Sequence, residues 1–310
     1  MIADFFTITV LVGILTSGIR LATPYLFAAI GETFSQRSGV LNLGVEGQML
    51  LGAFAAFYVS YITGNLWLAV LVAIVVGALM GLIMAFVSVN LQAQQGISGI
   101  GFYLFGLGAS DLLFQKLVGT VKIANSFSPV YIPVLSEIPG LGEIIFQQNV
   151  LVYVAFALVP VAWFVLNRTT LGLKIHAAGE NPAAADSLGV SIAGVRYFTI
   201  ILGGILSALA GASLSIAQSN VFQQGMTSGI GFIAVALVYF GGWRPWGVLG
   251  GALLFSMVNA LQLWIQVKGV GIPSDIAVMM PYVLTILVLV ASVSRVRGPS
   301  ALTKPFEREN

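Results

Sequence analysis

The sequence has no cysteine, a single histidine and few charges, since only 8% of its 310 residues are Asp, Glu, Lys or Arg. Without cysteine the chain can form no disulfide, thiolate metal site or cysteine nucleophile. His176 has no histidine partner and no H-E-x-x-H pattern, so we expect neither a metal site nor a catalytic residue. The phosphate-binding pattern G-x-x-x-x-G-K-[ST] is also absent, so we expect no cofactor in this chain and no nucleotide hydrolysis by it.

What the sequence has in abundance is apolar residues, at 58% of the chain, with a mean hydropathy of +0.99. An ordinary soluble domain carries roughly a quarter charged residues, so this composition predicts an integral membrane protein. Runs of about 20 apolar residues favour helices over a barrel, whose strands would alternate with period two. We therefore predict an all-α polytopic bundle in a single domain, 1–310. Nine candidate spans lie at roughly 8–30, 42–63, 66–89, 97–116, 149–166, 198–217, 228–241, 247–266 and 278–294. The alternative is that one short run, especially 228–241, does not cross the membrane.

The basic residues orient these spans. An odd number of crossings places the two termini on opposite sides, and cytoplasmic loops are enriched in Lys and Arg. With a cytoplasmic C-terminus, nine basic residues fall inside and three fall outside, which are Lys116, Lys122 and Lys268. The inside set is Arg37, Arg168, Lys174, Arg196, Arg244, Arg295, Arg297, Lys304 and Arg308. We therefore expect the N-terminus outside, with a cytoplasmic loop at about 167–197 and a cytoplasmic tail at about 295–310.

Two stretches of the chain are nearly the same: "QQGISGIGF" at 94–102 and "QQGMTSGIGF" at 223–232. With nine spans, the first starts a helix from the inside and the second starts one from the outside. Inverted repeats with Gly-interrupted helices are typical of transporter folds. The alternative is chance, because glycine is common in membrane helices. An inverted repeat with broken helices is thus one of two interpretations at this point.

The longest inside loop contains chain-breaking residues followed by "AAADSLGV". These residues predict a short helix with Asn181 as N-cap, Pro182 at the first position and Gly189 at the C-terminal end. Its small side chains would allow close docking into another protein. A helix that merely connects two spans is the alternative.

Three blocks of the sequence resemble ABC importer permeases of the branched-chain amino acid, ribose and nucleoside superfamily. They are "SQRSGVLNLGVEGQMLLGAF" (35–54), "AAGENPAAADSLGVS" (177–191) and "GIGFIAVALVYFGGWRPWGVLGGALLF" (229–255). The nucleoside or simple-sugar branch, which works with a lipoprotein of the basic membrane protein type, is the most similar. The resemblance implies that the loop containing Gly179, Glu180, Asn181, Pro182, Asp186 and Gly189 is the coupling helix, seated on an ATPase.

The resemblance also implies partners and a location. The partners would be a second related permease in a heterodimer, a cytoplasmic ATP-binding protein with two fused cassettes that holds ATP and Mg, and an external substrate-binding lipoprotein. The location would be the inner membrane of a bacterial cell, and no nucleic acid is expected as a partner. The implied substrate is a nucleoside, with a simple sugar as the alternative. An ion-coupled secondary carrier and a membrane scaffold without transport are competing classes.

A nucleoside is neutral and polar, so its path should offer amides and aromatic surface with few charges. The candidates are Asn42, Glu46, Gln48, Gln218, Asn220, Phe222, Gln223, Gln224 and Asn259, together with Gln262. Such amides can equally hold helices together. For Glu46, two hypotheses stay open: it accepts hydrogen bonds from ribose hydroxyls, or it holds the second span through amides at a helix N-terminus.

Overall fold

The computed structural model describes residues 8–268, 273–292 and 297–307, and within these ranges it contains helices and no strand. Arg295 and Arg308, of the predicted inside set, lie outside the described residues. In chain order the elements are α1 (Ile8–Arg37), α2 (Val45–Thr63), α3 (Leu66–Ala85), η2 (Phe86–Asn90), α4 (Gln95–Leu117), η3 (Gly142–Phe146), α5 (Val150–Arg168), α6 (Thr170–Glu180), α7 (Pro182–Ser187), α8 (Ile192–Ser213), η4 (Leu214–Gln218), α9 (Ile230–Phe240), α10 (Pro245–Lys268) and α11 (Ser274–Ser292), where η marks a π-helix. The chain is therefore all-α, as predicted.

Each of the nine predicted spans contains a helix. In the described part of the chain, seven helices are long and apolar enough to cross a membrane: α1, α2, α3 with η2, α4, α5, α8 with η4, and α10. α11 has 19 residues, whereas α9 has only 11. Eleven residues extend about 16 Å, which is half of a bilayer core. The prediction of a full helical span at 228–241 is therefore wrong, and the protein is a multi-pass membrane protein that includes a half-helix.

Two predicted boundaries need correction. The polar end of "PYLFAAIGETFSQR" was expected to terminate the first span near residue 30, yet α1 continues to Arg37. Glu32 and Gln36 lie four residues apart, on one face of the helix, and Gln36 Nε2 donates to Glu32 Oε1 over 2.9 Å. This local pairing lets polar residues stay helical and buried. At the other boundary α8 begins at Ile192, so Arg196 belongs to a helix rather than to the loop.

The centre of the bundle is a close contact between α3 and α8. A Cβ atom on Gly77 would lie 2.5 Å from the carbonyl oxygen of Gly204, and one on Gly81 would lie 2.8 Å from Cα of Ile201. Only glycine lets two helix backbones approach this closely, which is the usual basis of tight packing in membranes. The two helices run antiparallel, because Gly77 lies beside Gly204 and Gly81 beside Ile201.

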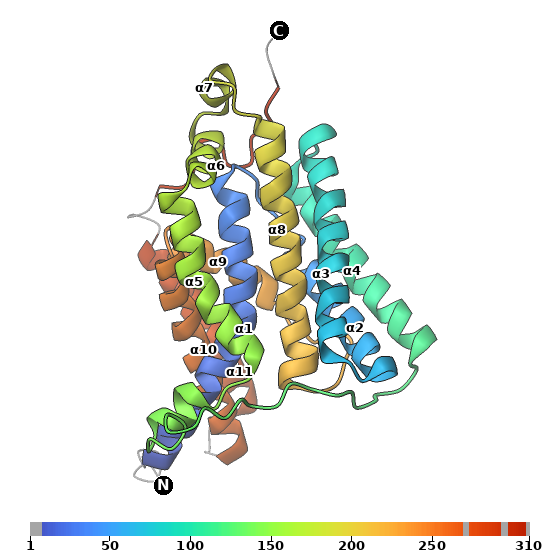
Figure 1. Ribbon diagram of the computed structural model, residues 1–310, viewed down its shortest axis with the longest axis vertical. Coiled ribbons are helices and arrows are strands. Elements are labelled where there is room, and N and C mark those ends of the chain that lie inside the picture. The colour runs from blue at the N-terminus through green and yellow to red at the C-terminus, as the bar shows by residue number, and fades with distance from the viewer. Residues whose placement is uncertain (1–7, 269–272, 293–296, 308–310) are drawn as a thin grey trace.

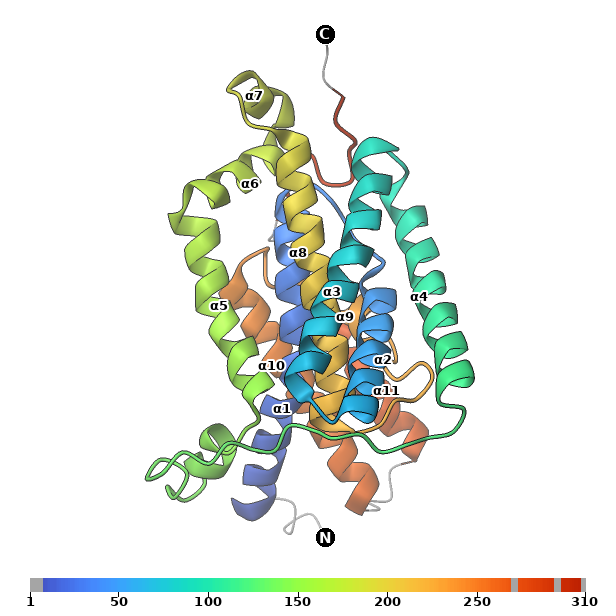
Figure 2. The same cartoon turned by 45° about the vertical axis from the view of Figure 1, so that its right-hand side comes forward.

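The chain between α1 and α2 enters the bundle without helical structure. Ser38, just after α1, has its Oγ 2.8 Å from Thr199 Oγ1 of α8. Met49, near the start of α2, lies instead against Gly211, much further along α8. Residues 199 and 211 are twelve apart, or about 18 Å along a helix. The helical residues 45–49 account for only about 6 Å of this distance. The irregular segment 38–44 covers the rest, so α2 starts well inside the membrane. Figure 2 shows the irregular segment descending from the end of α1 to the start of α2.

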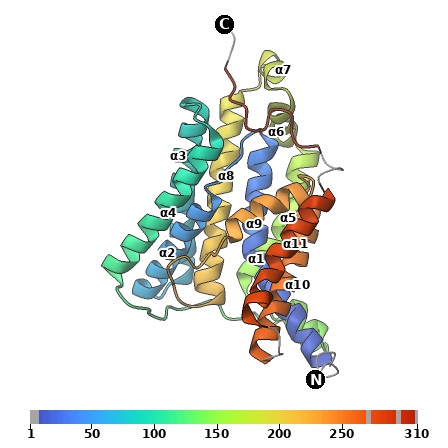
Figure 3. The ribbon, with the colours of Figure 1, turned by 180° about the vertical axis from the view of Figure 1, so that it is seen from behind.

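A second broken crossing lies between α8 and α10. Gln218 at the end of η4 donates to the carbonyl of Arg20 in α1, and Trp243, just before α10, accepts from Nε of Arg37 at the end of α1. The chain must return toward that end between these points, and α9 covers only part of the distance (Figure 3). Residues 219–229 provide the rest. Figure 1 shows the start of α1 and the segment 297–307 at opposite ends of the molecule, as an odd number of crossings requires.

The repeated sequence stretches belong to a repeated structural unit. α3 ends in the five-residue π-helix η2 and the first copy then starts α4, while α8 ends in the five-residue π-helix η4 and the second copy then leads into α9. α3 and α8 run antiparallel, so the two units are inverted. This correspondence supports the duplicated interpretation over chance. The units differ in one respect, because α4 has 23 residues and α9 has 11.

Candidate functional site

Glu46 of α2 forms the junction of the two broken crossings. Its Oε1 accepts hydrogen bonds from Thr227 Oγ1 over 2.6 Å and from the amide of Gly229 over 2.7 Å, and its Oε2 accepts from the amide of Gly231 over 2.6 Å. The side chain is only 3% exposed. The amides belong to the N-terminus of α9, where the helix dipole favours a negative charge. Glu46 therefore caps α9 from a neighbouring helix.

Both copies of the repeat contact the same short segment, 43–47. In the first copy a Cβ on Gly99 would lie 2.8 Å from Cβ of Leu43, and in the second copy a Cβ on Gly231 would lie 2.7 Å from Cα of Glu46. The rings of Tyr103 and Phe232, one residue apart in the aligned copies, also meet edge to face at 5.2 Å. The start of α2 thus packs between α4 and α9, and glycines of both helices make the close contacts.

The start of α2 is lined by amide side chains. Oδ1 of Asn42 accepts from the amide of Gly44 over 2.9 Å, and Asn42 Nδ2 donates to Gln48 Oε1 over 3.0 Å. Gln48 Nε2 is buried and has no hydrogen-bond partner among the described residues. This predicted pair is therefore brought together beside Glu46. Gln48 Nε2 therefore remains a buried donor that a water or a ligand can satisfy.

A chain of buried hydrogen bonds connects this amide pair with the end of the bundle near Trp243. The indole Nε1 of Trp243 donates to Gln36 Oε1 over 2.8 Å. Gln36 donates to Glu32 Oε1, which also accepts the backbone amide of Asn42 over 3.0 Å. Oε2 of Glu32 has no partner among the described residues. Linked bonds of this kind hold several elements in one arrangement, here α1, the 38–44 segment and the α9–α10 turn.

A second polar group lies on the other side of α9. Asn259 of α10 is hydrogen-bonded to the side chain of Tyr25, which lies close to Glu46 and Tyr282. The hydroxyl of Tyr282 donates to the carbonyl of Ser228 over 3.4 Å. Hydroxyls, an amide and two aromatic rings therefore surround the start of α9 together with Asn259, which was predicted for the pathway.

Of the remaining predicted pathway residues, Gln262 lies half-buried in α10, and the others lie on the segment 219–229 or just before it. Phe222 is fully buried and packs on Phe54 and Phe114, with ring centroids 5.4 and 5.3 Å away. Asn220 adopts φ +61°, and its carbonyl accepts from Ala124. Gln218 is bonded to α1, while Gln223 and Gln224 are exposed. The structure does not bring these residues together with Asn42 and Gln48, and their role in a pathway stays a prediction.

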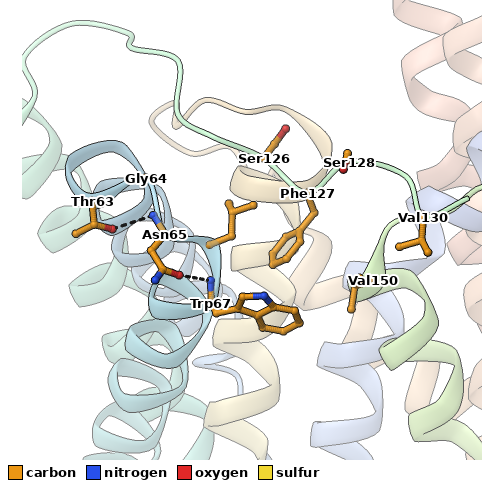
Figure 4. A pocket seen from close by; sticks show the side chains of 10 residues that line it. Thr63, Gly64, Asn65, Trp67, Ser126, Phe127, Ser128, Val130 and Val150 are labelled. Carbon is orange, nitrogen blue, oxygen red and sulfur yellow. Dashed lines mark hydrogen bonds between the residues drawn. The ribbon is translucent and has the colours of Figure 1, made fainter.

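A pocket of about 620 Å³ lies at the end of the bundle opposite α7. Trp67 and Phe127 meet there edge to face, with centroids 5.4 Å apart. Figure 4 shows that Asn65 points its oxygen at the backbone of Trp67 and that Thr63 bonds the backbone of Asn65. Asn65 is engaged in capping α3 and Thr63 accepts from the backbone of Asn65. The rest of the lining includes the aromatic residues Trp67 and Phe127, the aliphatic residues Leu66, Val130 and Val150, and Ser126 and Ser128.

The predicted loop helix is confirmed as α7. Asn181 caps it by accepting from the amide of Ala184 over 3.1 Å, Pro182 is its first residue, and Gly189 follows it with φ +83°. Leu188 is 85% exposed, so α7 presents an uncovered surface. Asp186 lines a pocket of about 420 Å³ together with Gly189 and Phe306. The predicted role of this loop in coupling is not tested by its geometry.

The C-terminal segment attaches α6 to the rest of this end. The amide of Ala301 donates to Gly179 O over 2.8 Å, and Ser300 Oγ donates to Glu180 Oε2 over 3.0 Å. Gly179 lies directly against the backbone of Arg37. Gly179 and Glu180, which the resemblance assigned to coupling, thus serve as anchor points between α6, the tail and the end of α1.

Sequence reasoning missed Glu32, Gln36, Thr227 and the tyrosines around α9. Glu32 and Gln36 had a detectable signal, because a polar pair at spacing four within an otherwise apolar run is typical of a buried helical pair. Thr227 and Tyr282 had none, since their partners lie far away in the chain. The helix α6 was also missed, because it follows α5 after only one non-helical residue, Thr169.

Comparison with known proteins places these features in a family. Residues 14–289 match the model of the branched-chain amino acid transport system permease component. A putative glucose ABC transporter permease of Haloferax volcanii is 38% identical, over 96% of this chain and 98% of the relative. A guanosine ABC transporter permease of Bacillus subtilis is 35% identical over 92% and 93%, and a nucleoside ABC transporter permease of Lactococcus lactis is 35% identical over 90% and 92%. The last two organisms each have a second relative of the same description, 27% and 22% identical. No solved structure matches the chain.

Proposed function

Because the chain belongs to the family of permease components of branched-chain amino acid transport systems, we propose that it is the membrane subunit of an ATP-driven importer for nucleosides. The observation that carries this proposal is the junction of two broken crossings beside neutral amides. A broken helix in a membrane is tolerated where its backbone lines a cavity or is buried in protein. Transporters use such breaks near the bilayer midplane to bind substrate.

The chemistry around the junction suits a neutral polar substrate. The carboxylate oxygens of Glu46 are occupied by the hydroxyl of Thr227 and by the amides of Gly229 and Gly231, so they are not free to bind a passing molecule. Asn42, Gln48 and Asn259 can donate and accept hydrogen bonds, and Tyr25 and Tyr282 add aromatic surface. The guanosine and nucleoside permeases among the relatives support a nucleoside. The 38% identical putative glucose permease supports a sugar as the second candidate.

The movement would come from a separate ATPase. We assign the docking contact to α7, whose Leu188 is exposed, and place ATP and Mg on that partner. Movement of α7 and α6 would reach the α1 end through Gly179 and the tail. The bonded chain Trp243–Gln36–Glu32–Asn42 then connects that end with the start of α2. Rocking of these elements would expose the junction to each side of the membrane in turn.

The remaining partners follow from the same family. The paired guanosine permeases of Bacillus subtilis and nucleoside permeases of Lactococcus lactis support a heterodimer with a second permease. A binding lipoprotein would deliver substrate at the end where Trp67 lies. The excess of basic residues near α7 and the tail supports a cytoplasmic position for that end, in the inner membrane of a bacterial cell.

Uptake by cells that express the permease with its neighbouring transporter genes tests this proposal. We expect labelled guanosine or another nucleoside to accumulate, and an excess of unlabelled nucleoside but not of glucose to compete. The inverse competition pattern would establish the sugar alternative. Uptake that persists when the ATPase gene is inactivated, and that collapses with the proton gradient, would contradict the importer and favour an ion-coupled carrier.

The docking role of α7 has its own test at Gly189. Its φ of +83° is strained for a branched residue, although a Cβ there would meet no described atom within 4 Å. We expect Gly189→Val to uncouple ATP hydrolysis from uptake while the permease stays folded. Gly189→Asn should be mild, because asparagine tolerates this conformation. Normal coupled uptake by the valine variant would contradict the assignment.

A further inference from the structure

A basic pocket at one end of the bundle is not used by the proposed transport cycle. It has a volume of about 770 Å³ and lies between the end of α1, the end of α5, α6 and the turn before α10. Its walls include Arg37, Arg244 and His176, together with the rings of Trp163 and Trp246. Three elements that are far apart in the chain therefore each contribute an arginine or a histidine to the lining of this pocket.

The charge of this pocket is of one sign. Arg37 and Arg244 are permanently cationic, and no acidic residue occurs among the described residues that line it. Nε2 of His176 is buried and has no hydrogen-bond partner among the described residues. Burial and the neighbouring Arg37 lower the pKa of His176, against the opposing effect of the nearby Glu180 carboxylate, and one ring nitrogen keeps a site for a hydrogen bond. Such a set of groups fits a phosphate.

The pocket also lies at a membrane–water boundary, whichever side that is. α5 and α10 are candidate spans, and the pocket is formed where α5 ends and α10 begins. Trp246 is 51% exposed, and the guanidinium of Arg168 lies 5.8 Å above the ring of Trp163. Tryptophan and arginine at span ends are typical of the headgroup level.

We propose that this pocket binds the phosphate of an anionic phospholipid headgroup. Basic pockets between helix ends are known to select such lipids. A lipid is favoured over a soluble phosphate because Trp163 and the half-exposed Trp246 line the pocket at the ends of two candidate spans, and acyl chains can extend along the exposed apolar faces of α5 and α10. The bound phosphate would bridge Arg37 and Arg244, which belong to the end of α1 and the α9–α10 turn.

This bridge would act on a contact that the structure already contains. Arg37 Nε donates to the carbonyl of Trp243 over 3.0 Å, and Trp243 also begins the buried chain of hydrogen bonds toward Asn42. A headgroup across Arg37 and Arg244 would therefore hold the α9–α10 turn in place. The lipid would favour one position of α9 relative to α1.

The test is retention of phosphatidylglycerol by the full-length permease, purified with its partner subunits and measured by native mass spectrometry against phosphatidylcholine. We expect wild-type protein to retain phosphatidylglycerol selectively. Arg244→Gln should weaken retention about tenfold, because a hydrogen bond to a charged group contributes about that factor. His176→Gln should weaken it less. Lys174→Gln is the matched control, since Lys174 is an exposed basic residue of α6 that does not line the pocket.

Three results would overturn the proposal. Equal loss of lipid in Arg244→Gln and Lys174→Gln would show that general surface charge is responsible. Displacement of phosphatidylglycerol by millimolar inorganic phosphate would show that the ligand is a soluble phosphate. Loss of the ATPase subunit from Arg244→Gln with unchanged lipid retention would make the pocket a protein contact. Thermal unfolding of each variant confirms that the compared proteins are folded.

Discussion

The two copies of the repeat have the same elements and different tasks. Both follow a helix that ends in a π-turn, and both direct glycines at residues 43–47, but only the second copy meets a carboxylate. The N-terminal amides of α9 are bonded to the carboxylate of Glu46, whereas α4 packs closely on Leu43 and Gly44 and its neutral Gln95 accepts from the amide of Leu41 over 2.8 Å. A duplicated unit has thus become asymmetric, because one side of α2 is held by a carboxylate and the other by close packing and a neutral amide.

This difference predicts which of the two helices, α4 or α9, can move relative to α2. Hydrogen bonds to a charged group contribute about 1.5–3 kcal/mol each, so the α2–α9 contact resists separation. The α2–α4 contact depends on close packing, which helices can change by small sliding movements. We therefore expect α2 and α9 to move together and α4 to move relative to them.

Removing the charge of Glu46 should have the largest effect on this comparison. In Glu46→Gln one acceptor oxygen becomes an NH₂ group, which faces an amide N–H of α9. We expect a loss of about 3–5 kcal/mol, as for other broken buried charge interactions. Thermal unfolding of the purified protein measures this. Glu143→Gln, in an exposed position, should be neutral, and equal stability of both variants would show that the carboxylate does not hold α9.

A pair of alanine substitutions at equivalent glycines separates the two copies. Gly101 and Gly231 occupy the same place in the repeat and both lie within helices, so alanine should raise helix propensity equally. A Cβ at Gly231 would meet the backbone of Glu46 at 2.7 Å, and one at Gly101 would meet no described atom within 4 Å. We expect Gly231→Ala to cost about 1–3 kcal/mol and Gly101→Ala to be neutral or stabilising. Similar unfolding temperatures would mean that the copies pack alike.

The shape contact of the first copy can be tested in the same way. A Cβ on Gly99 would lie 2.8 Å from Cβ of Leu43, while one on Gly96 would meet no described atom within 4 Å. We expect Gly99→Ala to reduce stability by about 1 kcal/mol, because the added methyl would meet the Cβ and backbone of Leu43, which lies in a non-helical segment that can shift, and to slow uptake more than Gly96→Ala does. If α4 does not slide over α2, both variants should transport at the wild-type rate.

The features that depend on local sequence patterns were predicted correctly. Long apolar runs identified the spans, and Asn181, Pro182 and Gly189 identified α7, because capping is decided within a few residues. The binding of Glu46 to amides at a helix N-terminus was one of two hypotheses, but the sequence did not identify α9 as the helix that supplies them. The partners Thr227, Gly229 and Gly231 lie 181 to 185 residues away from Glu46, and no local pattern contains that distance. The polar residues near the end of α1 were wrongly predicted to end that helix for a related reason. Glu32 accepts from the backbone amide of Asn42, which lies beyond the helix.

The last change is Asn42→Asp, which places a second buried carboxylate just before α2, next to Gln48. Asp loses the donor that now meets Gln48 Oε1, but Gln48 Nε2 is unpartnered among the described residues, so a rotation of the Gln48 amide would present a donor to the new carboxylate. The remaining oxygen can still accept from the amide of Gly44, near the positive end of α2. Because Asn42 is fully buried and its backbone amide is bonded to the carboxylate of Glu32, we expect the added charge to cost about 1–3 kcal/mol in thermal unfolding. Uptake should also fall, because the new carboxylate has fewer hydrogen-bond donors than Glu46 and adds charge beside the proposed path. We expect weaker transport of neutral nucleosides, measured as initial rates over a concentration series, and Asn42→Gln serves as a control for side-chain shape. Wild-type kinetics in Asn42→Asp would place substrate away from α2 and leave the tyrosine and Asn259 side of α9 as its path.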